Sequence, residues 1–136
     1  NRYAGAPSVA ATEVTADTPL TLFGKEVIPI AVEHGTLPIL GYRIGNLAYI
    51  TDAKYITQVE LSKLYKVDTL VLNALRKASH PTHLNIEEAL AIVKEVHPRQ
   101  TFFTHISQTM GFHAKVQKEL PAHVFLAYDN LIIDIK

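Results

Sequence analysis

Residues 27–52 read VIPIAVEHGTLPILGYRIGNLAYITD, and this stretch decides the fold. It holds apolar runs rich in Val, Ile and Tyr, residue types that are enriched in strands. The pair Gly45-Asn46 separates two of these runs and is a two-residue hairpin signal. The stretch therefore predicts antiparallel strands over 39–44 and 47–51, preceded by a further strand.

The elements on either side follow from similar patterns. Before the stretch, the letters TLFGK predict a short strand that turns at 23–25. After it, Asn85 and Glu88 have the spacing of a helix N-cap and its N3 partner, so the clearest helix covers 85–96. Apolar spacing and Gly or Pro breaks predict the other elements: helices over 57–66 and 112–120, and strands over 69–72, 101–106, 124–127 and 131–135.

This order of elements predicts an α/β (α+β) fold, a mixed sheet covered by helices. We expect one domain over 1–136, with residues 1–12 irregular. The start at Asn1, without an initiator Met, indicates a processed product or a fragment.

The composition excludes several classes of protein. Among 136 residues, 13 Lys and Arg balance 13 Asp and Glu, which argues against a broad nucleic-acid-binding face. The chain has no Cys, so disulfides, thiolate metal sites and Cys nucleophiles are excluded. No apolar run approaches the roughly 18 residues of a membrane span, and the first residues lack the form of a secretory signal. We therefore expect no membrane partner and a cytoplasmic location.

Four polar residues stand at strand ends or before a helix: His34, Asp52, His83 and His105. Imidazole and carboxylate together suit a hard or borderline metal ion. His83 precedes the helix over 85–96, whose N-terminus favours anions and suits a His that exchanges a proton with a phosphate. Each residue also has a structural reading: His34 capping a backbone group, Asp52 beginning a turn, His105 satisfied in the core, and His83 solvated in a loop.

Three segments in combination resemble the C-terminal half of a metallo-β-lactamase-fold hydrolase. They are EHGTLPILGYRIGNLAYITD, HPTHLNIEEAL, and TFFTHIS followed by MGFHAKVQKELPAHVFLAYD. The pattern is similar to the phosphodiesterase of the carbon–phosphorus lyase pathway and, more distantly, to ribonuclease Z. The resemblance implies the second half of a four-layer αβ/βα sandwich.

The resemblance also implies roles for individual residues. His34 and His105 match ligands of the first and second metal, and Asp52 matches the aspartate that bridges two divalent ions, zinc or manganese. His83 matches the catalytic His that contacts the phosphate, with His80 a weaker candidate for the same contact. Gln108 stands where relatives often have His, so we expect it to alter substrate contact.

The family motif HxHxDH is absent from the chain. The resemblance therefore implies half a site and an apolar sheet face left without its partner layer. We expect a companion chain, self-association over that face, or a longer parent protein. The isolated 136 residues should then bind metal weakly and lack activity.

The leading interpretation is the C-terminal portion of a hydrolase that cleaves a small phosphodiester or nucleotide-like substrate with a metal-activated water. A second hypothesis is a non-catalytic interaction module whose apolar face binds a partner. A third keeps the fold but changes the reaction to thioester or lactam hydrolysis.

Overall fold

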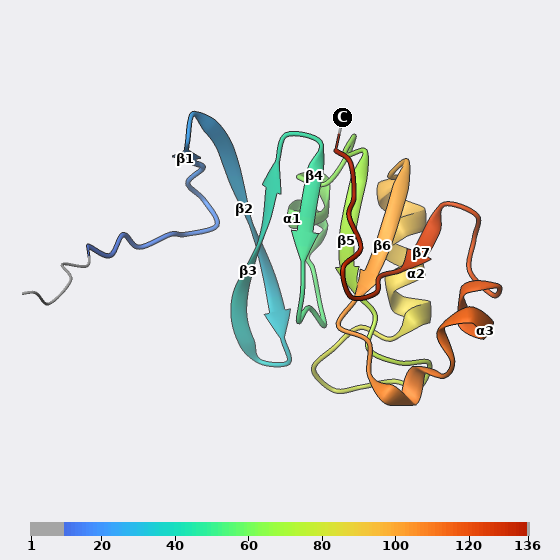
Figure 1. Ribbon diagram of the computed structural model, residues 1–136. Helices are drawn as coiled ribbons and strands as arrows, with labels where there is room; N and C mark the ends of the chain where they lie inside the picture. Colours follow the sequence, from blue (N-terminus) through green and yellow to red (C-terminus); the bar gives the residue numbers. More distant parts are fainter. Residues whose placement is uncertain (1–9, 136) are drawn as a thin grey trace, which may run out of the picture.

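The computed structural model describes residues 10–135 and contains one seven-stranded sheet in the order β1 to β7 (Figure 1). The strands are β1 (Leu20–Leu22), β2 (Lys25–His34), β3 (Leu37–Ile44), β4 (Leu47–Ile50), β5 (Thr69–Asn73), β6 (Gln100–Thr104) and β7 (Val124–Leu126). The helices are α1 (Gln58–Ser62), α2 (Ile86–Val96), the 3-10 turn η1 (Gln108–Met110) and α3 (His113–Gln117).

The sheet is mixed, as the sequence predicts. Strands β1 to β4 pair antiparallel, and β4 to β7 pair parallel. Gly45 forms the predicted tight turn between β3 and β4 with φ +56°. Because β2 and β4 both run antiparallel to β3, β2 points in the same direction as the parallel strands, and its carboxyl end reaches the same sheet edge as theirs.

The core lies between the sheet and the helices α1 and α2, which cover one face (Figure 1). Alternate strand residues point toward the helices, as the two-residue period of a strand requires. The fully buried members from the strands include Ile50, Leu70, Leu72 and Phe103, and they pack with Leu64, Ala89 and Val93 from the helical side.

The N-caps expected at Thr57 and Asn85 are confirmed. Asn85 accepts a hydrogen bond from the Glu88 backbone N–H, and the Glu88 carboxylate accepts one from the Asn85 N–H, which completes a capping box at α2. Thr57 caps α1 by accepting from the Glu60 N–H. The Glu60 carboxylate does not return to Thr57 but accepts from the backbone N–H of Ala31 on β2.

Two helices are shorter than predicted, the strand predicted over 101–106 ends at Thr104, and one predicted strand is absent. Helix α1 ends at Ser62 rather than at residue 66, and α3 covers five residues rather than nine. Residues 131–135, predicted as a strand, form none. Asn130 has φ +66°, and the Leu131 N–H donates to the Tyr128 carbonyl in a turn. This turn leads the chain across the sheet face opposite to α2 (Figure 1), away from the edge of β7.

Of the residues predicted to be irregular, 10–12 lie outside any helix or strand, and 1–9 fall outside the described residues. None of the helices within 10–135 has the length and apolar character needed to cross a membrane.

The sheet face opposite to α1 and α2 carries one apolar row across five strands. Cross-strand partners place Tyr42, Tyr49, Val71, Phe102 and Phe125 side by side. Tyr42, Tyr49 and Phe125 are 38%, 48% and 37% exposed, and the rings of Phe102 and Phe125 stack at 5.4 Å. No helix among residues 10–135 covers this row, but the chain after β7 crosses the same face in front of β5 (Figure 1). Val71 and Phe102 are only 8% and 9% exposed, so the row is open at Tyr42, Tyr49 and Phe125 and covered between them.

Candidate metal centre at the strand ends

The sheet topology brings the predicted site residues to one edge. His34 is the last residue of β2, Asp52 follows β4 by two residues, and His105 directly follows β6. His83 lies in the loop between β5 and α2. The carboxyl ends of these four strands share an edge, so residues up to 71 positions apart in sequence meet there.

Asp52 is the centre of the cluster. The Nε2 atom of His83 lies 3.3 Å from its Oδ1, and the Nε2 atom of His105 lies 3.4 Å from the same oxygen. The ring of His83 stacks on His105 at 4.7 Å and meets His34 edge-on at 4.6 Å. His83 therefore sits between the other two rings, against one carboxylate.

His34 has a defined tautomer. Its Nδ1 lies 2.9 Å from the carbonyl oxygen of Asp52. A carbonyl only accepts hydrogen bonds, so Nδ1 carries the proton and Nε2 keeps its lone pair. This arrangement is the one that a metal-ligating imidazole needs, because the second nitrogen is held by a backbone acceptor.

Two of the site residues adopt left-handed backbone conformations. Asp52 has φ +61° and His105 has φ +56°. Such conformations are uncommon outside Gly and persist only where surrounding contacts hold them. Both residues lie within two positions of a strand end, so these turns occur at the edge of the sheet.

The electrostatic surroundings keep Asp52 ionised and His83 neutral. Burial raises the pKa of Asp52, but the Thr51 hydroxyl, which donates to Oδ2 over 2.9 Å, and the adjacent His105 and His83 outweigh it and hold the pKa below 3.8. Burial is the largest cause that lowers the pKa of His83 below 6.5; the Asp52 hydrogen bond raises it, and His105 and His34 lower it. An anionic carboxylate and a neutral imidazole are the forms that bind metal.

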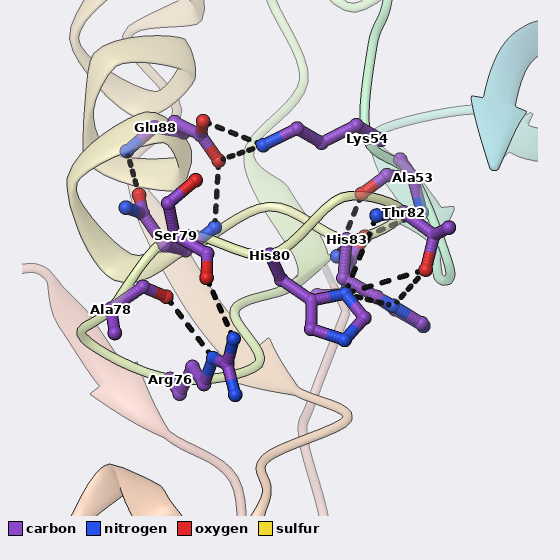
Figure 2. A network of polar contacts seen from close by, with 11 residues as sticks. Ala53, Lys54, Arg76, Ala78, Ser79, His80, Thr82, His83 and Glu88 are labelled. Atoms are coloured by element: carbon purple, nitrogen blue, oxygen red, sulfur yellow. Dashed lines mark hydrogen bonds and ion pairs between the residues drawn. The ribbon is translucent and has the colours of Figure 1, made fainter. Parts of the chain in front are cut away.

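The two predicted substrate contacts lie at different distances from the cluster. His80 Nδ1 is 3.2 Å from His83 Nδ1, and both face the Thr82 hydroxyl (Figure 2). Gln108 begins η1 and is exposed, and among residues 10–135 it makes no hydrogen bond with the cluster. His80 therefore adjoins the site, while Gln108 lies in the segment after β6 and, within the described residues, has no hydrogen bond to it.

The donor set fits a divalent ion. His34, Asp52 and His83 each offer a ligand atom, and these atoms lie within 4.8 Å of one another. This trio differs from the predicted one, in which His105 rather than His83 is a ligand. The rings of His83 and His105 both contact the same Asp52 oxygen. His105 stays the predicted ligand beside His34 and Asp52, and His83 is an alternative ligand at the same carboxylate.

Sequence patterns missed the residues that support the site. Thr51 donates to Asp52, and Thr82 contacts both His80 and His83. Asn73 bonds the backbone next to Asp52. The available signal was their position: Thr51 and Thr82 directly precede site residues, and Asn73 is a polar residue that ends an otherwise apolar strand.

Comparison with known proteins supports the fold. The profile described as a β-lactamase superfamily domain matches residues 1–106. The structure of a diphosphatase from the PhnP family is similar at 36% identity and a TM-score of 0.86, covering 90% of this chain and 48% of that one. The metallo-β-lactamase fold protein YhfI from Bacillus subtilis (22% identity, TM-score 0.72, covering 85% of this chain and 52% of that one) shares the fold. Human tRNase Z, short form (19%, TM-score 0.67, covering 86% and 44%), shares it as well.

A curated relative, an octanoyltransferase of Porphyromonas gingivalis, is 36% identical over the whole of this chain, which spans 28% of that protein. The chain thus spans less than half the length of both this relative and the PhnP-family diphosphatase. The activities in these two names are those of the relatives, each of which is more than twice as long as the part that this chain matches. From the profile match and the shared fold, we conclude that this chain belongs to the β-lactamase superfamily, with the architecture of its metallo-β-lactamase-fold hydrolases.

Proposed function

We propose that this chain is the C-terminal portion of a metal-dependent phosphodiesterase. The observation that carries the proposal is the convergence of four side chains at one sheet edge. The ligand atoms of His34, Asp52 and His83 lie within 4.8 Å of one another, and His105 Nε2 lies 3.4 Å from Asp52 Oδ1. The similarity to a PhnP-family diphosphatase supports a phosphate-containing substrate. The open polar edge suits a small phosphodiester or nucleotide-like molecule.

The residues have distinct duties in this proposal. The Nε2 atoms of His34 and His105 and the carboxylate of Asp52 would hold divalent ions, zinc or manganese. Such ions, when bound, supply Lewis acidity and lower the pKa of a water molecule. His83 would hold the phosphate or exchange a proton with the substrate, with His80 beside it.

The low pKa of His83 fits a group that accepts a hydrogen bond or a proton at neutral pH. A His whose pKa is far above the working pH would stay protonated and would be a poor base. Asp52 holds His83 from the side opposite to Thr82, so the ring orientation is fixed before any substrate arrives.

The remaining ligands would come from a companion half. This chain offers at most three of the predicted ligands, and it spans 48% of the PhnP-family diphosphatase chain. The apolar row from Tyr42 to Phe125 is the surface that a second layer would cover, and a large exposed apolar patch favours association. In the absence of such a half, self-association through the same face would cover the row.

The test is hydrolysis of bis-p-nitrophenyl phosphate by the full-length protein loaded with Mn²⁺ or Zn²⁺. We expect turnover that is lost in Asp52→Asn, and no turnover of a thioester or a lactam. The 136-residue chain alone should be inactive. A metal-loaded full-length protein that cleaves a thioester but no phosphodiester would overturn the proposal, and so would activity of the isolated chain.

The open apolar row also favours a second candidate, a non-catalytic interaction module. Zinc calorimetry separates the two functions. Binding that disappears in both His105→Ala and Asp52→Ala supports the hydrolase, whereas a wild-type protein that binds no metal supports the module.

A further inference from the structure

Asn73 is a buried polar residue at the junction of the site-bearing loops. It ends β5 and has an exposed fraction of 0%, as do its neighbours Leu72 and Ala74. A buried amide is costly unless its donor and acceptor are both paired. Its partners therefore indicate why an amide, rather than another apolar residue, ends this strand.

Both partners of the Asn73 side chain belong to one residue. The Ala53 N–H donates to Oδ1 over 2.8 Å, and Nδ2 donates to the Ala53 carbonyl oxygen over 2.9 Å. The amide thus reproduces the double hydrogen bond of a sheet partner at a point where the strand ladder has ended. The pair is reciprocal, so it fixes Ala53 in position and in rotation about the chain.

Ala53 directly follows Asp52, whose backbone is in the left-handed region at φ +61°. This conformation needs support from outside the turn. Ala53 is itself fully buried, and the Asn73 amide holds both of its backbone polar groups. The two hydrogen bonds from Asn73 to the Ala53 backbone therefore restrain the turn that carries the Asp52 carboxylate.

The same point connects to the other site residues. The Ala53 carbonyl also accepts from the Leu84 N–H over 2.8 Å, directly after His83 in the chain. Thr104, the cross-strand partner of Asn73, precedes His105 and accepts from the Ala74 N–H over 3.0 Å. Asn73 thus bonds directly to Ala53 beside Asp52, and Ala53 bonds to Leu84 beside His83. Asn73 also pairs across the strands with Thr104 beside His105.

We propose that Asn73 is a positioning residue that sets Asp52 and His83 in register with one another. The idea rests on the proposed function for its consequence, metal binding, but the placement itself is a property of the fold. Loss of the amide should let the turn at Asp52 move. It should also lengthen the hydrogen bond between the His34 Nδ1–H and the Asp52 carbonyl.

The test compares three variants of the full-length protein. Asn73→Leu keeps the side-chain volume and removes both bonds, while Asn73→Asp keeps the acceptor and removes only the donor to Ala53. Thr69→Val is the matched control: Thr69 is equally buried at the other end of β5, and its hydroxyl accepts from Gln100 over 2.8 Å. The control removes a partly buried side-chain hydrogen bond from the same strand without touching the site.

Two readouts separate positioning from stability. The first is the solvent exchange of the His34 Nδ1–H in the metal-free protein, by nitrogen-15 NMR. The second is Mn²⁺ or Zn²⁺ affinity by calorimetry below the unfolding temperature. We expect faster exchange and about 10- to 100-fold weaker affinity in Asn73→Leu, the range for loss of a group that orients a ligand. Asn73→Asp should be intermediate, and Thr69→Val unchanged.

Equal effects of Asn73→Leu and Thr69→Val, or no effect of Asn73→Leu on the His34 proton, would overturn the proposal. If Asn73→Leu fails to fold, Asn73→Asp carries the same comparison. A wild-type protein that binds no metal would contradict the proposed function, and the exchange readout would still decide the role of Asn73.

Discussion

The Nδ1–H of His34 donates to the carbonyl oxygen of Asp52 over 2.9 Å, so one predicted ligand fixes the orientation of the other's backbone. The bond leaves the Nε2 lone pair of the neutral His34 ring available to a metal ion. The two residues come from strands separated in the sheet by β3, so only the folded sheet can form this pair. Metal binding should therefore depend on both residues together.

Replacing His34 tests this dependence. His34→Ala removes the Nε2 donor and the hydrogen bond to Asp52, so metal affinity in the full-length protein should fall by at least about tenfold, the lower end for loss of a supporting group. Calorimetric titration with Zn²⁺ measures the change. His123→Ala is the control, because His123 is exposed and precedes β7 at the opposite edge of the sheet. Equal affinity in wild type and His34→Ala would contradict the site.

His83→Gln separates a catalytic role from a ligand role. Gln keeps polarity and comparable length but cannot exchange a proton near neutral pH. We expect kcat for the phosphodiester to fall by about 10²- to 10⁴-fold with metal affinity near wild type. Metal affinity that falls as steeply as in His34→Ala would instead place His83 among the ligands, as its distance from Asp52 allows.

The sequence predicts most of the elements because their signals are local. The hairpin at Gly45 and the capping box of Asn85 and Glu88 depend on residues that are close in the chain, and both are present as predicted. The alternation in 131–135 is also local, but a strand needs a ladder partner, and the turn at Asn130 leads this segment away from β7.

The site was predictable only as a set of strand-end residues. Their meeting depends on β2 running in the same direction as β4, which the pairing of both strands with β3 determines. His83 contacts Asp52 from 31 positions away, and Asn73 hydrogen-bonds Ala53 from 20 positions away. Neither leaves a periodic trace in the sequence.

The capping box of α2 predicts a pH-dependent contribution to stability. Burial raises the pKa of Glu88, but hydrogen bonds from Lys54 (Figure 2) and from the Asn85 N–H outweigh it and hold the pKa below 4.5. Its ionised form is thus favoured by folding, so the stabilisation is complete above pH 4.5 and is lost as the pH falls through the folded-state pKa. Glu88→Gln should lower the free energy of unfolding at pH 7 by about 0.5–1 kcal/mol.

Urea denaturation at several pH values measures this contribution. The gap between wild type and Glu88→Gln should close as the solution is acidified. Glu87→Gln is the matched control, because Glu87 is exposed in the same first helical turn. A gap that is the same at every pH would show that the charge of Glu88 is not involved.

The open sheet face predicts association of the isolated chain. Tyr49 on β4 is the most exposed member of the row, with 48% of its surface accessible. We expect the wild-type 136-residue chain to self-associate in sedimentation experiments and Tyr49→Glu to shift it toward monomer, because a buried unpaired carboxylate is costly. Val59→Glu, at a residue of α1 that is 72% exposed, should have no effect. A monomeric wild-type chain would contradict the prediction.

Gly35 offers a test of how closely the turn after β2 is packed against the His83 loop. Its φ is +62°, and a Cβ there would lie 2.9 Å from the Thr82 Cγ2. Gly35→Ala should therefore cost about 1–2 kcal/mol for the left-handed backbone and in addition push Thr82 away from His83. Gly45 has a similar φ of +56°, and a Cβ there would meet nothing within 4 Å. Gly45→Ala should therefore lower stability only through the strained backbone. Only Gly35→Ala should shift the ring resonances of His83 and lower kcat, and identical behaviour of the two variants would show that Thr82 does not orient His83.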